Sequence, residues 1–183
     1  METMEMKAAG IVFMRELFKQ SAAGQEEEFL SQLNPEETMQ YKNCLPVSWM
    51  PIYNYVRILK RGAQILFPGD PAPLQRLSAA EAEYDLQGVY RVLLKVISIP
   101  ALVNQTAKLW DKYYKRGVAR TEADYASKRA TLFVEKYPEL PAESRETVTG
   151  YLKGALNLTG VKNVQITPDD ADPNQWKWLI TWD

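Results

Sequence analysis

Hydrophobic residues in the first two-thirds of the chain recur every three or four positions, the spacing of one face of an α-helix. The pattern is strongest over residues 50–66 and over residues 85–114. The second region contains two hydrophobic stripes separated by Ser98–Pro100, so it predicts two consecutive helices around which the fold is organised. Shorter helices are predicted over residues 11–19, 25–33 and 35–41, and around residues 74–77.

Two segments have the residue spacing of a capping box at a helix start. Asn34 is followed by Pro35 and by Glu37, which supplies an N-cap, a proline in the first turn and a glutamate three residues after the cap. Ser78 and Glu81 have the same spacing, so a second capped helix start is predicted at Ser78.

The hydrophobic period changes from helical to alternating after Gly117. In the last segment of the chain Trp176, Trp178 and Ile180 recur at every second position, as expected for a strand with one buried face. The remaining elements are predicted in the order ββαββ, over residues 118–125, 129–137, 143–158, 161–167 and 175–182.

The predicted fold class is α+β, with a helical N-terminal two-thirds followed by a four-stranded antiparallel sheet. A chain of 183 residues is large enough to bury a proper core, and 46% hydrophobic with 25% charged residues is typical of a globular protein. One domain is expected over residues 1–183, with a helical part at about 8–116 and a ββαββ part at about 117–183.

The charge balance and the cysteine count limit the expected partners and location. Lys and Arg number 22 against 23 Asp and Glu, so neither nucleic acid nor an anionic membrane is an expected partner. The longest apolar region, residues 89–103, is interrupted by charges and a proline, so no membrane span is predicted. A cytoplasmic location is expected because Cys44 is the single cysteine and the chain starts without a secretory signal pattern.

The chain contains no histidine. This excludes Ser-His-Asp and Cys-His nucleophile systems and removes the commonest protein ligand of zinc and of haem iron. No metal site and no catalytic residue is therefore predicted, and haem is not expected, although a haem could still take a tyrosine ligand or Cys44, the only thiolate available. Glu81, Glu83 and Asp85 are available carboxylates, but acid–base catalysis needs a carboxyl with a raised pKa in a pocket, and a capped helix start accounts for these residues at least as well.

The order of packing residues resembles an uncharacterised bacterial family of about 180 residues, whose function is unknown. The resemblance rests on three motifs, Pro46-x-x-Trp49-x-Pro51-x-x-x-Tyr55, the run DLQGVYR at residues 85–91, and Leu109-Trp110-x-x-Tyr113-Tyr114-x-x-Gly117.

The succession of helices and then ββαββ also resembles the superfamily of haem nitric-oxide sensors, vinyl-reductase-like domains and transport-tethering subunits. That resemblance implies an apolar cavity between helices and sheet, which holds haem, a lipid chain or another small molecule. Neither the proximal histidine of the haem sensors nor the cysteine cluster of some vinyl-reductase-like domains has a counterpart in this sequence.

These observations lead to a hypothesis of a non-enzymatic, haem-free ligand-binding or sensory domain, with an apolar small molecule or lipid as ligand. With five Trp and ten Tyr residues, aromatic side chains are in surplus and suit a pocket wall. The lining candidates are Trp49, Tyr53, Tyr90, Leu94, Trp110 and Tyr114.

The alternative is a homodimeric interaction module in signalling or trafficking, in which the same aromatic residues form a protein–protein surface. An enzyme comes third, and would need a pocket with a strongly perturbed Glu, Lys or Tyr.

Overall fold

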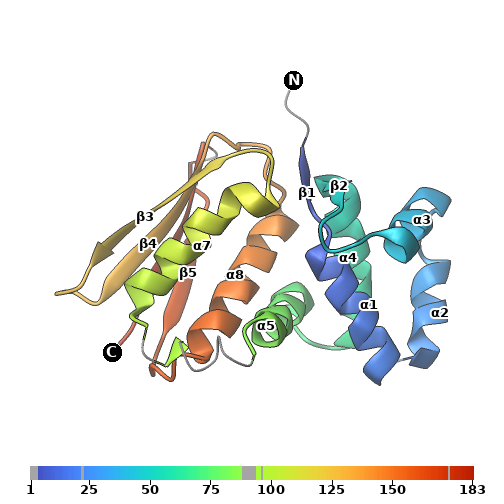
Figure 1. Cartoon of the computed structure of the whole chain (residues 1–183), viewed down its shortest axis with the longest axis horizontal. Helices are drawn as coiled ribbons and strands as arrows, with labels where there is room; N and C mark the ends of the chain where they lie inside the picture. Colours follow the sequence, from blue (N-terminus) through green and yellow to red (C-terminus); the bar gives the residue numbers. More distant parts are fainter. Residues whose placement is uncertain (1–3, 22, 88–93, 96, 173) are drawn as a thin grey trace.

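A computed structural model of the chain describes residues 4–21, 23–87, 94–95, 97–172 and 174–183. It confirms the predicted fold class, with helices in the N-terminal two-thirds followed by a four-stranded antiparallel sheet (Figure 1). The elements of the N-terminal part are β1 (Glu5–Lys7), α1 (Ala9–Ser21), α2 (Ala23–Ser31), α3 (Pro35–Asn43), β2 (Trp49–Pro51), α4 (Ile52–Leu66) and α5 (Pro73–Asp85). The elements that follow are α7 (Ile99–Tyr113), β3 (Val118–Asp124), β4 (Arg129–Glu135), α8 (Ala142–Asn157), β5 (Gln165–Asp169) and β6 (Gln175–Thr181).

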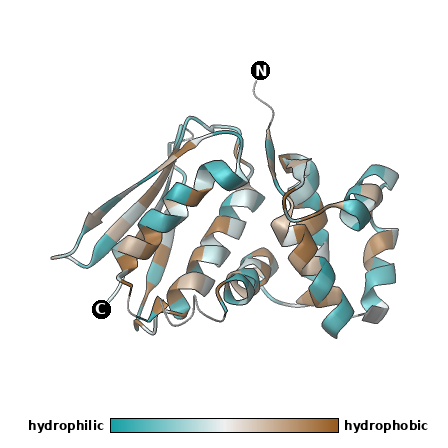
Figure 2. Ribbon diagram, viewed as in Figure 1, coloured by the Kyte–Doolittle hydropathy of each residue, from teal (hydrophilic) through white to brown (hydrophobic). Residues whose placement is uncertain are grey.

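The N-terminal core forms where α1 and α4 lie side by side, and Figure 2 shows hydrophobic residues gathered there. Ile11, Met14 and Phe18 of α1 are fully buried, as are Ile58 and Leu59 of α4. These positions have the helical spacing on which the prediction of both helices depended.

The capping box at the start of α3 is confirmed. The backbone N–H of Glu37 donates to the Asn34 side chain at 2.8 Å, and the backbone N–H of Asn34 donates to the Glu37 carboxylate at 3.1 Å. Glu37 is 1% exposed and also accepts hydrogen bonds from Arg57 and Arg61 of α4, each at 2.7 Å. Burial opposes these contacts, but the hydrogen bonds and the two arginines together lower the pKa of Glu37. One carboxylate therefore caps α3 and ties it to α4.

The sheet has the strand order β3-β4-β6-β5, with every neighbouring pair antiparallel. In its register Leu132 of β4 lies opposite Trp178 of β6, and Val134 lies opposite Trp176. These four side chains are buried on the face that α7 and α8 cover (Figure 1). The indole N–H of Trp178 donates to the Thr149 hydroxyl of α8 at 2.9 Å, which connects the sheet to the helix layer. The alternating pattern of the last strand thus predicted its buried face correctly.

Several predicted boundaries differ from the structure. The capping box at Ser78 is wrong: α5 begins at Pro73, so Ser78 lies in the interior of the helix, where it is 2% exposed. The helix predicted from residue 50 begins at Ile52 instead, because Trp49–Pro51 pairs with β1. The strand predicted over residues 161–167 lies instead at Gln165–Asp169, as β5, where it pairs in register with β6.

The two central helices predicted over residues 85–114 are found only in part. Asp85 ends α5, and residues 88–93 and 96, which make up most of the first predicted helix, lie outside the described residues. The break at Ser98–Pro100 is confirmed: the Ser98 side chain accepts a hydrogen bond from the backbone N–H of Ala101 at 3.4 Å, and α7 begins at Ile99.

Helices α5 and α8 pack unusually closely. A Cβ atom at Gly150 would lie 2.3 Å from the carbonyl oxygen of Gln75, and one at Gly154 would lie 2.4 Å from the carbonyl oxygen of Ala79. Real Cβ atoms essentially never approach other atoms within 3.0 Å, so both positions require glycine for this separation of the two helix backbones. The contact positions the inner face of α5 opposite α8.

Candidate functional site

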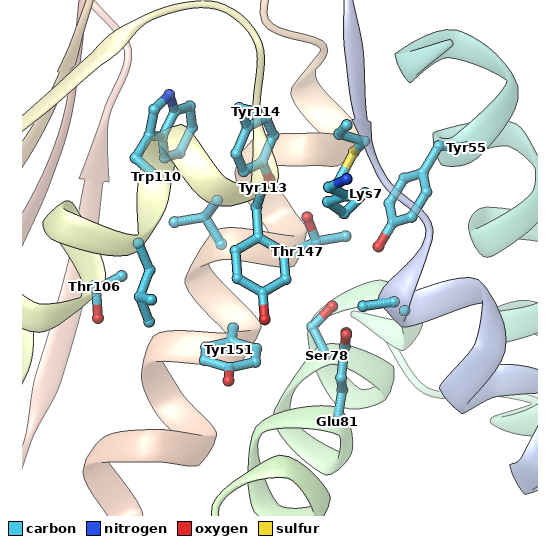
Figure 3. Close-up of a pocket in the computed structure, with 15 residues that line it drawn as sticks. Lys7, Tyr55, Ser78, Glu81, Thr106, Trp110, Tyr113, Tyr114, Thr147 and Tyr151 are labelled. Carbon is cyan, nitrogen blue, oxygen red and sulfur yellow. The ribbon is translucent and has the colours of Figure 1, made fainter. Parts of the chain in front are cut away.

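A cavity of about 120 Å³ lies where the N-terminal helices meet α7 and α8 (Figure 3). Fifteen residues line it, contributed by β1, α1, α4 and α5 on one side and by α7, Tyr114 and α8 on the other. None of the described residues of β3–β6 is among them, because α7 and α8 lie between the cavity and the sheet. The pocket that was predicted between helices and sheet is therefore a pocket between helices.

One wall of the cavity is apolar and aromatic. Trp110 of α7 and Tyr114 stack with ring centroids 3.9 Å apart and an angle of 7° between the ring planes. The Trp110 indole N–H donates to the carbonyl oxygen of Arg116 at 2.8 Å, which satisfies its polar atom outside the cavity. Met6 and Val148, both buried, extend this wall.

Hydroxyl groups from four elements surround the same space. They belong to Tyr55 of α4, Ser78 of α5, Tyr113 of α7 and Tyr151 of α8. Figure 3 shows the oxygen atoms of Tyr55, Tyr113 and Ser78 directed toward one region of the cavity. Burial raises the pKa of all three tyrosines, so they are neutral phenols at physiological pH. The phenols of Tyr55 and Tyr113 can both donate and accept hydrogen bonds, whereas Tyr151 donates its O–H to Asp85 at 3.3 Å and is left to accept one from a guest.

Glu81 brings a carboxyl group into this ring of hydroxyls, and its side chain points into the cavity (Figure 3). The residue is 9% exposed, and no hydrogen bond or ion pair joins its carboxylate to any described residue. Burial, with a smaller contribution from the charge of Asp85 one helical turn later, raises the pKa of Glu81 to about 8. The site therefore holds a buried acid that is mostly protonated at neutral pH.

A glycine allows the main chain of α1 to approach this acid. A Cβ atom at Gly10 would lie 2.4 Å from the Tyr55 hydroxyl oxygen and 3.0 Å from a Glu81 carboxylate oxygen. The first turn of α1 thus closes the cavity over Tyr55 and Glu81, and a larger residue at position 10 would separate the two groups from it.

The structure brings two of the six predicted lining residues, Trp110 and Tyr114, to the cavity. Leu94 is buried in the core at 5% exposure and is not part of the lining. Trp49 and Tyr53 are 36% and 46% exposed; the Trp49 ring lies under the ammonium groups of Lys7 and Lys115, at 3.9 and 4.8 Å from its centroid. Tyr90 lies outside the described residues.

Sequence reasoning missed Glu81 as a site residue because its spacing from Ser78 was interpreted as a cap. One signal was available: the hydrophobic positions Leu74, Leu77 and Ala82 place Ser78 and Glu81 on the buried face of the helix. A carboxylate on such a face is rarely buried without a partner or a function. By contrast Glu83, which was considered beside it, is exposed.

Within the described part of the chain, no group of three or more Cys, Asp or Glu side chains is arranged to hold a metal ion. No helix among the described residues is long and apolar enough to cross a membrane. Cys44 is buried at 7% exposure beside α3, as is common for a free cysteine, and does not line the cavity.

No protein-family model matches the chain, and no curated protein matches its sequence. Its structure, however, is similar to solved structures of H-NOX proteins. The H-NOX protein from S. oneidensis in the Fe(II)NO ligation state is 13% identical, with 97% of this chain and 99% of that chain covered and a TM-score of 0.67. The Fe(II) unliganded H-NOX protein from K. algicida is 12% identical, with 97% of each chain covered and a TM-score of 0.61. A mutant form of the H-NOX from T. tengcongensis is 11% identical, with 97% and 98% covered and a TM-score of 0.58. At such identities the similarity concerns the fold, and it confirms at that level the resemblance to the haem nitric-oxide sensors.

Proposed function

We propose that this chain, which has the fold of the H-NOX proteins, is a non-enzymatic, haem-free ligand-binding or sensory domain of the bacterial cytoplasm. The observation that carries the proposal is the cavity of about 120 Å³, with an apolar wall and a few convergent polar groups, at the junction of the two parts of the fold. A concave apolar site with a small number of placed polar groups is the usual form of a small-molecule site. The ligand is a small molecule, held between β1, α1, α4 and α5 on one side and α7, Tyr114 and α8 on the other.

The described residues of the pocket do not fit a haem. A haem iron in a protein takes an axial ligand from histidine, cysteine, methionine or tyrosine. The chain has no histidine, Cys44 lies elsewhere, and burial favours the neutral phenol of each lining tyrosine over the phenolate that iron would need. Met6 lines the site and is a possible axial ligand, but the cavity is too small for a macrocycle. An engineered cavity of 150 Å³ holds a molecule the size of benzene, and this cavity measures about 120 Å³. These features support a haem-free domain.

A binding role is favoured over catalysis, although Glu81 meets one requirement for acid–base chemistry. Its pKa of about 8 is in the range from which a general base or acid works at neutral pH. Nucleophilic catalysis would also need a side chain activated by hydrogen bonding to this carboxyl. Among the described residues neither Ser78 nor Tyr55 donates such a bond, and the site contains no cysteine or metal cluster.

Filling the cavity is expected to abolish the binding of small molecules without unfolding the protein. Val148 of α8 lines the pocket and is 8% exposed, so a phenylalanine at this position would occupy much of the available space. In NMR titrations with toluene, wild-type protein is expected to bind, and Val148→Phe is expected to bind at least tenfold more weakly. Val118→Phe, at a half-exposed position on β3, is the matched control and should bind like wild type.

Native mass spectrometry of the protein produced in two different hosts tests the same proposal with natural ligands. A retained small molecule in the wild type that is absent from Val148→Phe would support it. A retained mass equal to haem would overturn the haem-free part. A folded wild type that retains nothing and does not bind toluene would contradict the ligand-binding function itself.

A second candidate, a homodimeric interaction module, is supported by exposed hydrophobic side chains in the segment that runs from the end of α3 to the first turn of α4. Leu45, Val47, Trp49 and Tyr53 are all exposed within nine residues of the chain, and aromatic residues of this kind are enriched in interfaces. If this surface mediates dimerisation, light scattering should detect a dimer at high concentration that the double variant Trp49→Ser, Tyr53→Ser converts to a monomer. A wild type that is monomeric at all concentrations tested would exclude the homodimer.

A further inference from the structure

We propose that the pocket binds a small primary alkylammonium ion, with the ammonium group against the carboxylate of Glu81 and the alkyl chain along the apolar wall. The inference rests on the proposed ligand-binding function and names the chemical class of the ligand.

Glu81 has no hydrogen-bond or ion-pair partner among the described residues. It is more than nine-tenths buried and directed into the cavity, yet no described donor or cation pairs with it. A buried carboxylate without a partner is strongly unfavourable, and in folded proteins buried charges are paired or coordinate cations. A guest that carries a positive charge would supply the missing partner.

The groups that face Glu81 leave the site without a competing cation. Tyr55 of α4, Tyr113 and Tyr114 of the α7 side and Tyr151 of α8 are neutral, and Asp85 on α5 itself is acidic. Lys7 of β1 is the one cation among the described lining residues. Its ammonium group donates to the carbonyl oxygen of Val47 and lies over the Trp49 ring, so it is engaged away from Glu81.

The surrounding hydroxyls favour a primary ammonium over a fully methylated one. A primary ammonium group has three N–H donors, as in lysine, and can use one on the carboxylate and the others on hydroxyl oxygens. Tyr55, Ser78 and Tyr113 present such oxygens to the same region of the cavity (Figure 3). A quaternary ammonium has no N–H group and would leave these acceptors without a donor.

The size and polarity of the remaining space limit the alkyl part. Leu109, Val148 and Met6 provide an apolar wall on which methylene groups can pack. A cavity of about 120 Å³ is somewhat smaller than the 150 Å³ cavity that holds benzene, which has six non-hydrogen atoms. An amine with about four carbons, such as n-butylamine, fits this limit, and longer polyamines do not.

Binding of such a cation is linked to release of a proton from Glu81. The carboxyl has a pKa of about 8 without ligand, whereas an alkylammonium remains charged well above that pH, as lysine does. Only the ionised fraction of Glu81 is competent to pair with the ammonium group, so the apparent affinity falls with that fraction. Binding is therefore expected to be at least about tenfold weaker at pH 6 than at pH 8.5.

The experiment is a calorimetric titration of the whole chain with n-butylammonium chloride and with 1-butanol, its neutral counterpart of similar shape. At pH 8.5 wild type is expected to bind n-butylammonium at least tenfold more tightly than 1-butanol. The preference should disappear in Glu81→Gln, which keeps the shape of the side chain and removes its charge. Glu83→Gln, an exposed site on the same helix, is the matched control and should retain the preference.

Three results would overturn the inference while the ligand-binding function stands. The first is equal affinity of wild type for n-butylammonium and 1-butanol. The second is a preference for the cation that persists in Glu81→Gln, and the third is a preference that does not change between pH 6 and pH 8.5. If wild type binds neither of these molecules nor toluene, the proposed function fails together with the inference.

Discussion

Replacing Glu81 by glutamine is expected to raise the free energy of unfolding by roughly 3–5 kcal/mol at pH 9, an unusually large stabilisation for one substitution. The carboxyl has a pKa of about 8 in the folded protein against 4.5 for the free group, a difference of about 3.5 pH units. Each unit corresponds to about 1.36 kcal/mol, so ionising this buried group opposes folding by several kcal/mol. Glutamine removes the ionisation and keeps the volume.

The pH dependence gives the sign of this effect. Because the pKa of Glu81 is raised by folding, the native state holds a proton that the unfolded state has lost between about pH 4.5 and pH 8. Below pH 4.5 the carboxyl is protonated in both states and does not affect the free energy of unfolding. As the pH rises from 4.5 toward 8, the free energy of unfolding of wild type decreases. Urea denaturation at pH 5, 7 and 9 should show the difference between Glu81→Gln and wild type growing from about 1 kcal/mol or less to its full value.

The control for this measurement is Glu83→Gln on the same helix. Its side chain is exposed, so its effect should stay within about 0.5 kcal/mol at each pH. A Glu81→Gln variant whose stability relative to wild type is the same at pH 5 and pH 9 would contradict the assignment of Glu81 as a buried, unpaired acid.

Replacing Gly150 or Gly154 by alanine is expected to lower the free energy of unfolding by about 1–3 kcal/mol each. Alanine in a helix interior normally stabilises relative to glycine by roughly 0.5–1 kcal/mol. Here the added methyl group would overlap the backbone of α5, at 2.3 Å from the Gln75 carbonyl oxygen or 2.4 Å from that of Ala79. A backbone cannot rotate away as a side chain can, so α5 must move from α8, and the packing loss exceeds the gain in helix propensity.

Thermal or urea denaturation of Gly24→Ala provides the comparison, since a Cβ atom at Gly24 of α2 would meet nothing within 4 Å. That variant should be as stable as wild type or slightly more stable. If Gly150→Ala behaved in the same way, the close approach of α5 and α8 would be refuted. Because α5 carries Ser78 and Glu81 while α8 carries Thr147 and Tyr151, the alanine variants should also bind ligands more weakly.

Gly150 and Gly154 of α8 and Glu81 of α5 shape the same site. The glycines of α8 let α5 approach closely, and Glu81 on α5 is buried without a hydrogen-bond or ion-pair partner among the described residues. If a cation binds as proposed, its pairing with Glu81 offsets the energy that ionisation of this buried carboxyl costs, and the stability of the fold would then respond to the ligand.

The sequence by itself determined most of the local structure. Patterns among residues a few positions apart predict one helix or strand at a time. Examples are the hydrophobic stripe of α4, the capping box of Asn34 and Glu37, and the alternation of Trp176, Trp178 and Ile180. The absence of histidine limited the chemistry in the same direct way. By contrast β1 and β2, three residues each, exist because they pair with one another across more than 40 positions, and no local pattern predicts such a pairing.

Only the tertiary structure decided which aromatic residues surround a cavity and which acid is inside it. Trp49 and Tyr113 have the same amphipathic character in the sequence, but Trp49 lies outside the cavity under two lysines while Tyr113 lines it. Glu81 and Tyr151 are 70 positions apart and reach one cavity because α5 and α8 approach at glycines. The burial of Glu81, and therefore its pKa, depends on all the groups that surround it in space. Those groups come from six helices and strands that are far apart in the sequence.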